Sequence, residues 1–127
     1  MEYLVDTHTL LWYLDGHPAL SQKLVLALDN SSRIVVSIVS LWEITIKSSS
    51  GKIELTFSLD ENRDKMSENQ QFKMLDISFD HLNTLSTLPH IHGDPFDRLL
   101  IAQAISENLT IISADRHFKA YPVQVTW

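Results

Sequence analysis

The sequence predicts an α/β fold: a mostly parallel central sheet of four to five strands flanked by helices, in one domain over residues 1–127. Short apolar runs rich in β-branched residues, such as Ile34–Val36, alternate along the chain with longer segments of helical periodicity. Glycine (3) and proline (4) are too scarce to form a linker. A chain of this length buries about two thirds of its surface on folding, enough for one core. Strands that alternate with helices pair in parallel, and helices cover both faces of their sheet.

The first strand and the first two helices are expected before residue 30. Tyr3–Val5 is short, apolar and followed by Asp6, which predicts a buried strand. A helical pattern then runs from Thr9 to Leu14 and ends at Gly16. Pro18 is expected in the first turn of a second helix, because proline suits that position. One face of that helix is apolar and is expected to pack against the core or against a second copy of the chain. It is formed by Leu20, Leu24 and Leu28.

The middle of the chain continues the alternation. Ile34–Val36 predicts the second strand. Ser40–Glu43 has the spacing of a capping box, so a helix is expected to begin there, with Glu43 in its first turn, and to end at Gly51. The mostly polar segment 58–71 predicts an exposed helix, and Phe72–Ile77 predicts a third strand.

Two helices and two strands are expected in the last third of the chain. Phe79–Leu88 predicts a helix that Pro89 ends, and Asp94–Pro95 begins a helix that runs to about Glu107. Thr110–Ile112 and Val123–Val125 predict the closing strands.

Composition limits the classes of function. No apolar run exceeds five residues, so no membrane span is expected. The first basic residue is Lys23, so no secretory signal is expected and the predicted location is the cytoplasm. The chain has no cysteine, so a metal must be held by oxygen or nitrogen. Its 10 basic and 16 acidic residues give a net charge of −6, which argues against nucleic-acid binding by bulk charge.

Five carboxylates are expected at one edge of the sheet, because the carboxyl ends of parallel strands meet there. Asp6 lies just past the first strand, Asp115 lies just past the strand at Thr110–Ile112, and Glu43 lies near the start of the helix that leaves the second strand. The helix that begins at Asp94 leads into a strand that starts at the opposite edge. Its N-terminus, with Asp94 and Asp97, therefore points back to the same edge.

Each of these acids also suits a structural role as a helix cap or turn residue. Such roles do not explain so many acids at one edge, where the nearby cations are Arg98 and Lys47, the latter spaced to pair with Glu43. Clustered carboxylates repel one another and take up protons unless a cation shares their site. Oxygen ligands favour Mg²⁺ or Mn²⁺, which also bind phosphate and assist in-line hydrolysis. The residues therefore predict metal-dependent phosphodiester cleavage.

Four blocks of the sequence resemble the PIN domain of VapC-type toxins, in order and in spacing: Leu4–His8, Trp42–Ile44, His92–Ala104 and Ser113–Asp115. The resemblance covers nearly the whole chain and implies a three-layer PIN-like sandwich. It implies a Mg²⁺- or Mn²⁺-dependent endoribonuclease that is the toxin of a toxin-antitoxin pair. The partners it implies are an RNA substrate, a cognate antitoxin protein and a second copy of the chain in a homodimer.

The resemblance also assigns roles residue by residue. It implies a catalytic and metal-binding quartet, with the first and third members foremost as direct ligands: Asp6, Glu43, Asp97 and Asp115. Asp94 is expected to cap its helix rather than to bind metal. Ser113 matches a hydroxyl residue two places before the fourth acid and is expected to bond a metal-bound water or the substrate. Thr7 and Arg98 are further candidates, and His8 stands where the family commonly has asparagine.

Three other interpretations compete with this one. A catalytically silent relative would bind RNA or protein at the same edge, but the intact set of four acids argues against it. A phosphoacceptor signalling domain needs paired acids after the first strand and a lysine after the last core strand. Here Asp6 has no acidic neighbour, and Lys119 falls in a loop or short helix. His90, His92 and Asp94 alternate but lack a fourth zinc ligand, so a surface loop is expected there.

Overall fold

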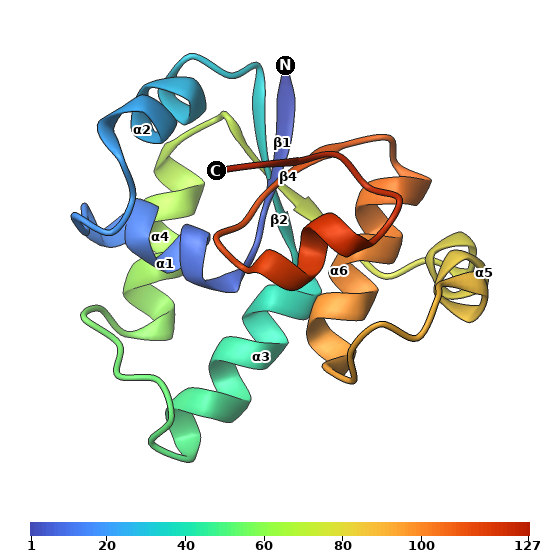
Figure 1. Ribbon diagram of the computed structural model, residues 1–127. Coiled ribbons are helices and arrows are strands. Elements are labelled where there is room, and N and C mark those ends of the chain that lie inside the picture. Colours follow the sequence, from blue (N-terminus) through green and yellow to red (C-terminus); the bar gives the residue numbers. More distant parts are fainter.

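A five-stranded, wholly parallel sheet forms the centre of the molecule in the computed structural model, which describes residues 1–127 (Figure 1). The strand order is β3-β2-β1-β4-β5. In chain order the elements are β1 (Glu2–Val5), α1 (Thr7–Asp15), α2 (Gln22–Asp29), β2 (Arg33–Ser37), α3 (Ile38–Ser49), α4 (Leu59–Glu68), β3 (Phe72–Leu75), α5 (Phe79–Thr87), α6 (Pro95–Ser106), β4 (Thr110–Ile112), the 3₁₀-helix η1 (Arg116–Ala120) and β5 (Val125–Thr126). The predicted fold class is confirmed.

Alternate side chains of the central strands enter two cores, one on each face of the sheet. Leu4 and Val35 pack with the buried side chains of α6. Val5 and Val36, the next residues along the same strands, pack with α1 and α2. Figure 1 shows α1, α2 and α4 on one side of the sheet and α5 and α6 on the other. Burial on both faces explains why these strands are apolar without interruption. None of the helices has the length and apolar character needed to cross a lipid bilayer.

Helix α2 begins later than the sequence predicted. Its first residue is Gln22, and the hydroxyl of Ser21 caps it by accepting the N–H of Leu24 at 3.3 Å. Pro18 therefore precedes the helix, because the capping serine lies three residues further along the chain. The leucine stripe faces the chain's own core, with exposed fractions of 4%, 4% and 0% for Leu20, Leu24 and Leu28. It is not available to a second copy of the chain.

Helix α3 begins earlier than predicted. Strand β2 leads directly into it, and the hydroxyl of Ser37 caps it by accepting the N–H of Val39 at 3.0 Å. The capping box predicted at Ser40 is wrong, since that side chain is buried inside the helix and its hydroxyl has no hydrogen-bond partner. Glu43 consequently lies in the second turn rather than the first, where it is 4% exposed.

The remaining differences lie at the ends of elements. Strand β3 ends at Leu75 instead of Ile77, where its pairing with β2 ends, and β5 covers Val125–Thr126 instead of Val123–Val125. The register of β5 follows its neighbour, because Ile111 of β4 pairs with Val125. Helix α4, predicted as exposed, buries Asn62 and Met66 against the rest of the molecule.

Candidate active site

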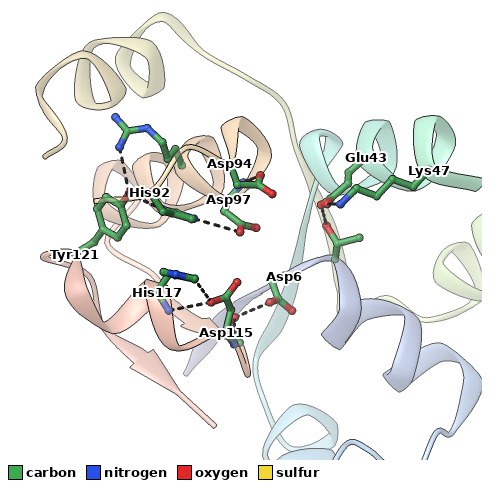
Figure 2. Close-up of polar contacts among 12 residues, drawn as sticks. Asp6, Glu43, Lys47, His92, Asp94, Asp97, Asp115, His117 and Tyr121 are labelled. Atoms are coloured by element: carbon green, nitrogen blue, oxygen red, sulfur yellow. Dashed lines mark hydrogen bonds and ion pairs between the residues drawn. The ribbon is translucent and has the colours of Figure 1, made fainter. Parts of the chain in front are cut away.

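Carboxylates from separate parts of the chain line one cavity of about 290 Å³ at the carboxyl edge of the sheet (Figure 2). The sheet is parallel, so the ends of β1 and β4 and the starts of α3 and α6 meet there. The five acids predicted for this edge all line the cavity, namely Asp6, Glu43, Asp94, Asp97 and Asp115.

Asp6 is the most constrained of these acids. One oxygen caps α1 by accepting the N–H of Thr9 at 2.9 Å, and the other accepts the hydroxyl hydrogen of Ser113 at 2.6 Å. The Ser113 oxygen in turn accepts the N–H of Asp115 at 3.0 Å. Burial raises the pKa of Asp6, an effect that the hydrogen bonds from Ser113 and Thr9 only partly offset. Ser113 therefore links two of the predicted catalytic acids.

Glu43 is the acid with its own cation. The ammonium of Lys47, one helical turn later, pairs with one of its oxygens, and the hydroxyl of Thr7 donates to the other. The hydrogen bond to Glu43 raises the pKa of Lys47, so the lysine stays charged. The predicted pair of Glu43 and Lys47 is confirmed, and Thr7 positions the glutamate.

Asp97 lies close to the other acids of the cavity and has a strongly raised pKa. Its carboxylate is 18% exposed and has no lysine or arginine partner. Burial raises its pKa to about 8, aided by the negative charges of Asp94, Asp115, Glu43 and Asp6. Asp94 caps helix α6, because its side chain accepts the N–H of Asp97 at 2.9 Å. The cavity therefore holds more negative charge than its own side chains compensate.

Two histidines lie beside these acids: His92, which was weighed only as part of an incomplete zinc site, and His117, which the sequence did not single out. The imidazole Nε2 of His92 lies 3.4 Å from Asp97 Oδ2, and Nδ1 of His117 lies 2.9 Å from Asp115 Oδ1. Their rings stack with centroids 4.9 Å apart, and the hydroxyl of Tyr121 lies 2.7 Å from Nδ1 of His92 (Figure 2). His92 was expected in a surface loop, yet its side chain is only 12% exposed. The only feature of the sequence that pointed to a place for His92 in this site was its position two residues before Asp94.

The pKa of Asp115 shifts in the opposite direction to that of Asp97. Partial burial raises it, but hydrogen bonds from the backbone and side chain of His117 outweigh this effect, and the pKa is lowered. Arg98 does not join the cluster. Its guanidinium donates to the carbonyl of Pro89 at 2.8 Å and to the hydroxyl of Tyr121 at 3.2 Å. It supports the wall behind His92 rather than neutralising the acids.

The donor set fits a hard divalent cation that keeps much of its water. No three histidine, aspartate or glutamate side chains lie close enough together to enclose a metal ion by themselves. Mg²⁺ needs only one or two carboxylates, since water and phosphate complete its octahedral shell. Asp6 and Asp97, both with raised pKa values and neither with a lysine or arginine partner, are the oxygen donors that gain most from such an ion.

Comparisons with known proteins agree with this fold. Residues 3–124 match the model of the PIN domain family. The fold resembles VapBC2 from Rickettsia felis bound to a DNA fragment from its promoter, with a TM-score of 0.72, 21% identity, and coverage of 99% of this chain and 98% of that chain. It also resembles DNA-bound VapBC from Salmonella typhimurium (TM-score 0.69, 17% identity, coverage 99% and 97%) and a toxin-antitoxin complex from Klebsiella pneumoniae (0.63, 19%, 98% and 96%). A search of curated proteins finds no match. Because the family model spans nearly the whole sequence, this chain belongs to the PIN domain family.

Proposed function

We propose that this chain is an endoribonuclease that depends on Mg²⁺ or Mn²⁺ and acts as the toxin of a toxin-antitoxin pair. The observation that carries the proposal is that five carboxylates from separate parts of the chain line one cavity, and their mutual repulsion and burial raise the pKa of Asp97. A site with that charge is suited to a cation and, through the cation, to a phosphodiester. Membership of the PIN domain family and the likeness to toxin-antitoxin complexes support the same reading.

Different side chains of the cavity would contact the metal ion and the phosphate. Asp6 and Asp97 would hold the ion, which supplies positive charge and Lewis acidity at the scissile phosphate when it is bound. Asp6 is kept in place by Ser113 and by the N-terminus of α1. Lys47 lines the cavity as its one lysine or arginine and can approach a phosphate oxygen. Asp115, whose pKa is lowered, stays ionised over the working pH range.

The negative cavity also indicates how an antitoxin would act. An arginine or lysine of the partner would pair with these carboxylates and compete with the metal. The same negative field would speed the association of a basic partner. Expression of the chain alone in the cytoplasm is expected to arrest growth, and co-expression of the antitoxin is expected to relieve the arrest. The homodimer stays a prediction, now without the leucine stripe as its surface.

RNA cleavage by the purified chain tests the proposal. Cleavage should require Mg²⁺ or Mn²⁺ and stop when EDTA is added. Asp6→Asn and Asp97→Asn keep the shape of each side chain and remove its charge, so each should lower the rate about 100-fold or more. Asp80→Asn, an exposed acid in the first turn of α5, is the matched control and should leave the rate unchanged. Full activity in both site variants would contradict the metal site and favour the binding-module interpretation.

A further inference from the structure

A second cavity, of about 470 Å³, adjoins the acidic cavity and has no role in the proposed cleavage. His8 and Trp12 line both cavities, which makes them one continuous surface. The second cavity lies between α1 and the segment 52–56, which follows α3. A ligand held at the acids can therefore extend along α1 into it.

Aromatic rings gather where the two cavities meet. The ring of Trp12 lies 5.7 Å from that of His8 and 6.0 Å from that of His17, the latter nearly parallel at 25°. Trp127 contributes a third neighbour at 5.8 Å. His8 and His17 are exposed, Trp12 is half-buried, and Trp127 is 43% exposed. Trp12 packs partly against the core, and the cluster still presents aromatic surface to solvent beside the acids.

Polar groups of the second cavity are incompletely paired. Asp15 and Asn62 both line it, and each has one buried side-chain oxygen without a hydrogen-bond partner. Asn62 is 6% exposed, so its free oxygen is an acceptor held away from bulk water. Lys52 and Glu54 add opposite charges to the same lining. A ligand with flat rings and N–H donors would match these features.

We propose that Trp12, with His8, His17 and Trp127 around it, is a stacking site for an unpaired nucleobase next to the scissile phosphate. This inference rests on the proposed ribonuclease function. The chain carries a net charge of −6, so attraction of its surface for the phosphate backbone contributes little to RNA affinity. Stacking on aromatic side chains does not depend on charge, because every base has a π face. The continuity of the two cavities places such a base directly beside the acids.

RNA binding without cleavage tests the stacking site. The probe is a labelled, unstructured oligoadenylate of about ten nucleotides, and its affinity is measured by fluorescence anisotropy in an Asp97→Asn background. Trp12→Leu should weaken binding about 5- to 100-fold, the usual effect of removing one stacking ring. Trp12→Phe keeps an aromatic face and should restore most of the affinity. Phe79→Leu removes an aromatic ring that is 76% exposed on α5, and serves as the matched control with unchanged affinity.

Tryptophan fluorescence gives a second readout that a merely destabilised chain would not mimic. Replacing Trp42 and Trp127 by phenylalanine leaves Trp12 as the single tryptophan. Its emission should be quenched as oligoadenylate is added, because a stacked base contacts its ring. Thermal unfolding of each variant reports on the fold separately.

Equal affinity of Trp12→Leu and its parent, or no quenching, would overturn the stacking site. If Trp12 instead contacts a second copy of the chain, Trp12→Leu would alter the oligomeric state and leave RNA affinity unchanged, which also overturns the stacking site. Metal-dependent cleavage by the unmodified chain together with either result would refute the stacking site alone. Failure of both cleavage and oligoadenylate binding would refute the proposed function as well.

Discussion

Replacing Asp97 by asparagine is expected to stabilise the metal-free protein. In the folded chain the pKa of this carboxyl is raised from 3.8 to about 8, first by burial and then by the neighbouring carboxylates. The unfolded chain releases the same proton near the ordinary value. Between about pH 4 and about pH 8 the folded state therefore binds more protons than the unfolded state, so the free energy of unfolding falls as the pH rises. Above about pH 8 Asp97 is ionised in both states, so its contribution to the free energy of unfolding no longer changes with pH.

The size of the effect follows from the same shift. Each pKa unit corresponds to about 1.4 kcal/mol, and about three units separate the ordinary value from pH 7. At pH 7 the folded carboxyl still holds its proton while the unfolded one has released it, which lowers the free energy of unfolding by about 4 kcal/mol relative to acid pH. Its side chain is only 18% exposed, so solvent screens little of this cost. Asparagine has nearly the same shape and no charge, and avoids the cost at every pH.

Urea unfolding in the presence of a chelator measures the difference. Asp97→Asn should exceed the parent by less than about 2 kcal/mol near pH 5 and by about 4 kcal/mol near pH 7. Added Mg²⁺ should stabilise the parent more than the variant, because the ion binds the ionised carboxylate of the folded state. Asp80→Asn, exposed in the first turn of α5, should differ from the parent by less than about 1 kcal/mol at both pH values. A variant less stable than the parent near pH 7 would refute the electrostatic reasoning.

Three further predictions follow from the same structure. RNA cleavage should rise from mildly acid to mildly alkaline pH, because protons compete with metal at Asp6 and Asp97; a flat profile with chemistry rate-limiting would contradict this. Asp94→Asn keeps a cap on α6 but removes a charge, so the pKa of Asp97 measured by NMR should fall, and an unchanged value would count against the charge cluster. Phe118→Ala, at a fully buried position, should lower the free energy of unfolding in urea by about 3–5 kcal/mol, and a loss under about 1 kcal/mol would contradict its role in the core.

The order of the elements and the gathering of the acids were both predictable from local pattern. Asp6 and Asp115 follow short apolar runs that are buried on both faces of the sheet, and such runs between turn residues are typical of parallel strands. Once the strands are parallel, everything that follows them lies at one edge. Asp97 was predicted at the same edge because α6 runs antiparallel to the strand that follows it, so the N-terminus of α6 lies at the carboxyl edge.

The exact starts of α2 and α3 were not predictable in this way. Near α2 both Pro18 and Ser21 suit a helix start, and near α3 local sequence does not rank Ser37 above Ser40. The choice is made by the sheet, because β2 pairs with β3 as far as Ser37 and the chain can turn into a helix only beyond that pair. Glu43 consequently lies one turn deeper than expected, next to Thr7 instead of at an exposed cap.

The sequence by itself determined the α/β class, the parallel order and the acids at the carboxyl edge, because these depend on periodicity and on residues directly beside a strand. Only the tertiary structure decided what each acid contacts. Tyr121 meets His92 across 29 positions of sequence, and Ser113 meets Asp6 across 107. Arg98, which directly follows Asp97, binds Tyr121 instead of the carboxylates. Side chains so far apart in sequence leave no local pattern, and their burial and mutual charge, which set the pKa of Asp97, exist only once the chain is packed.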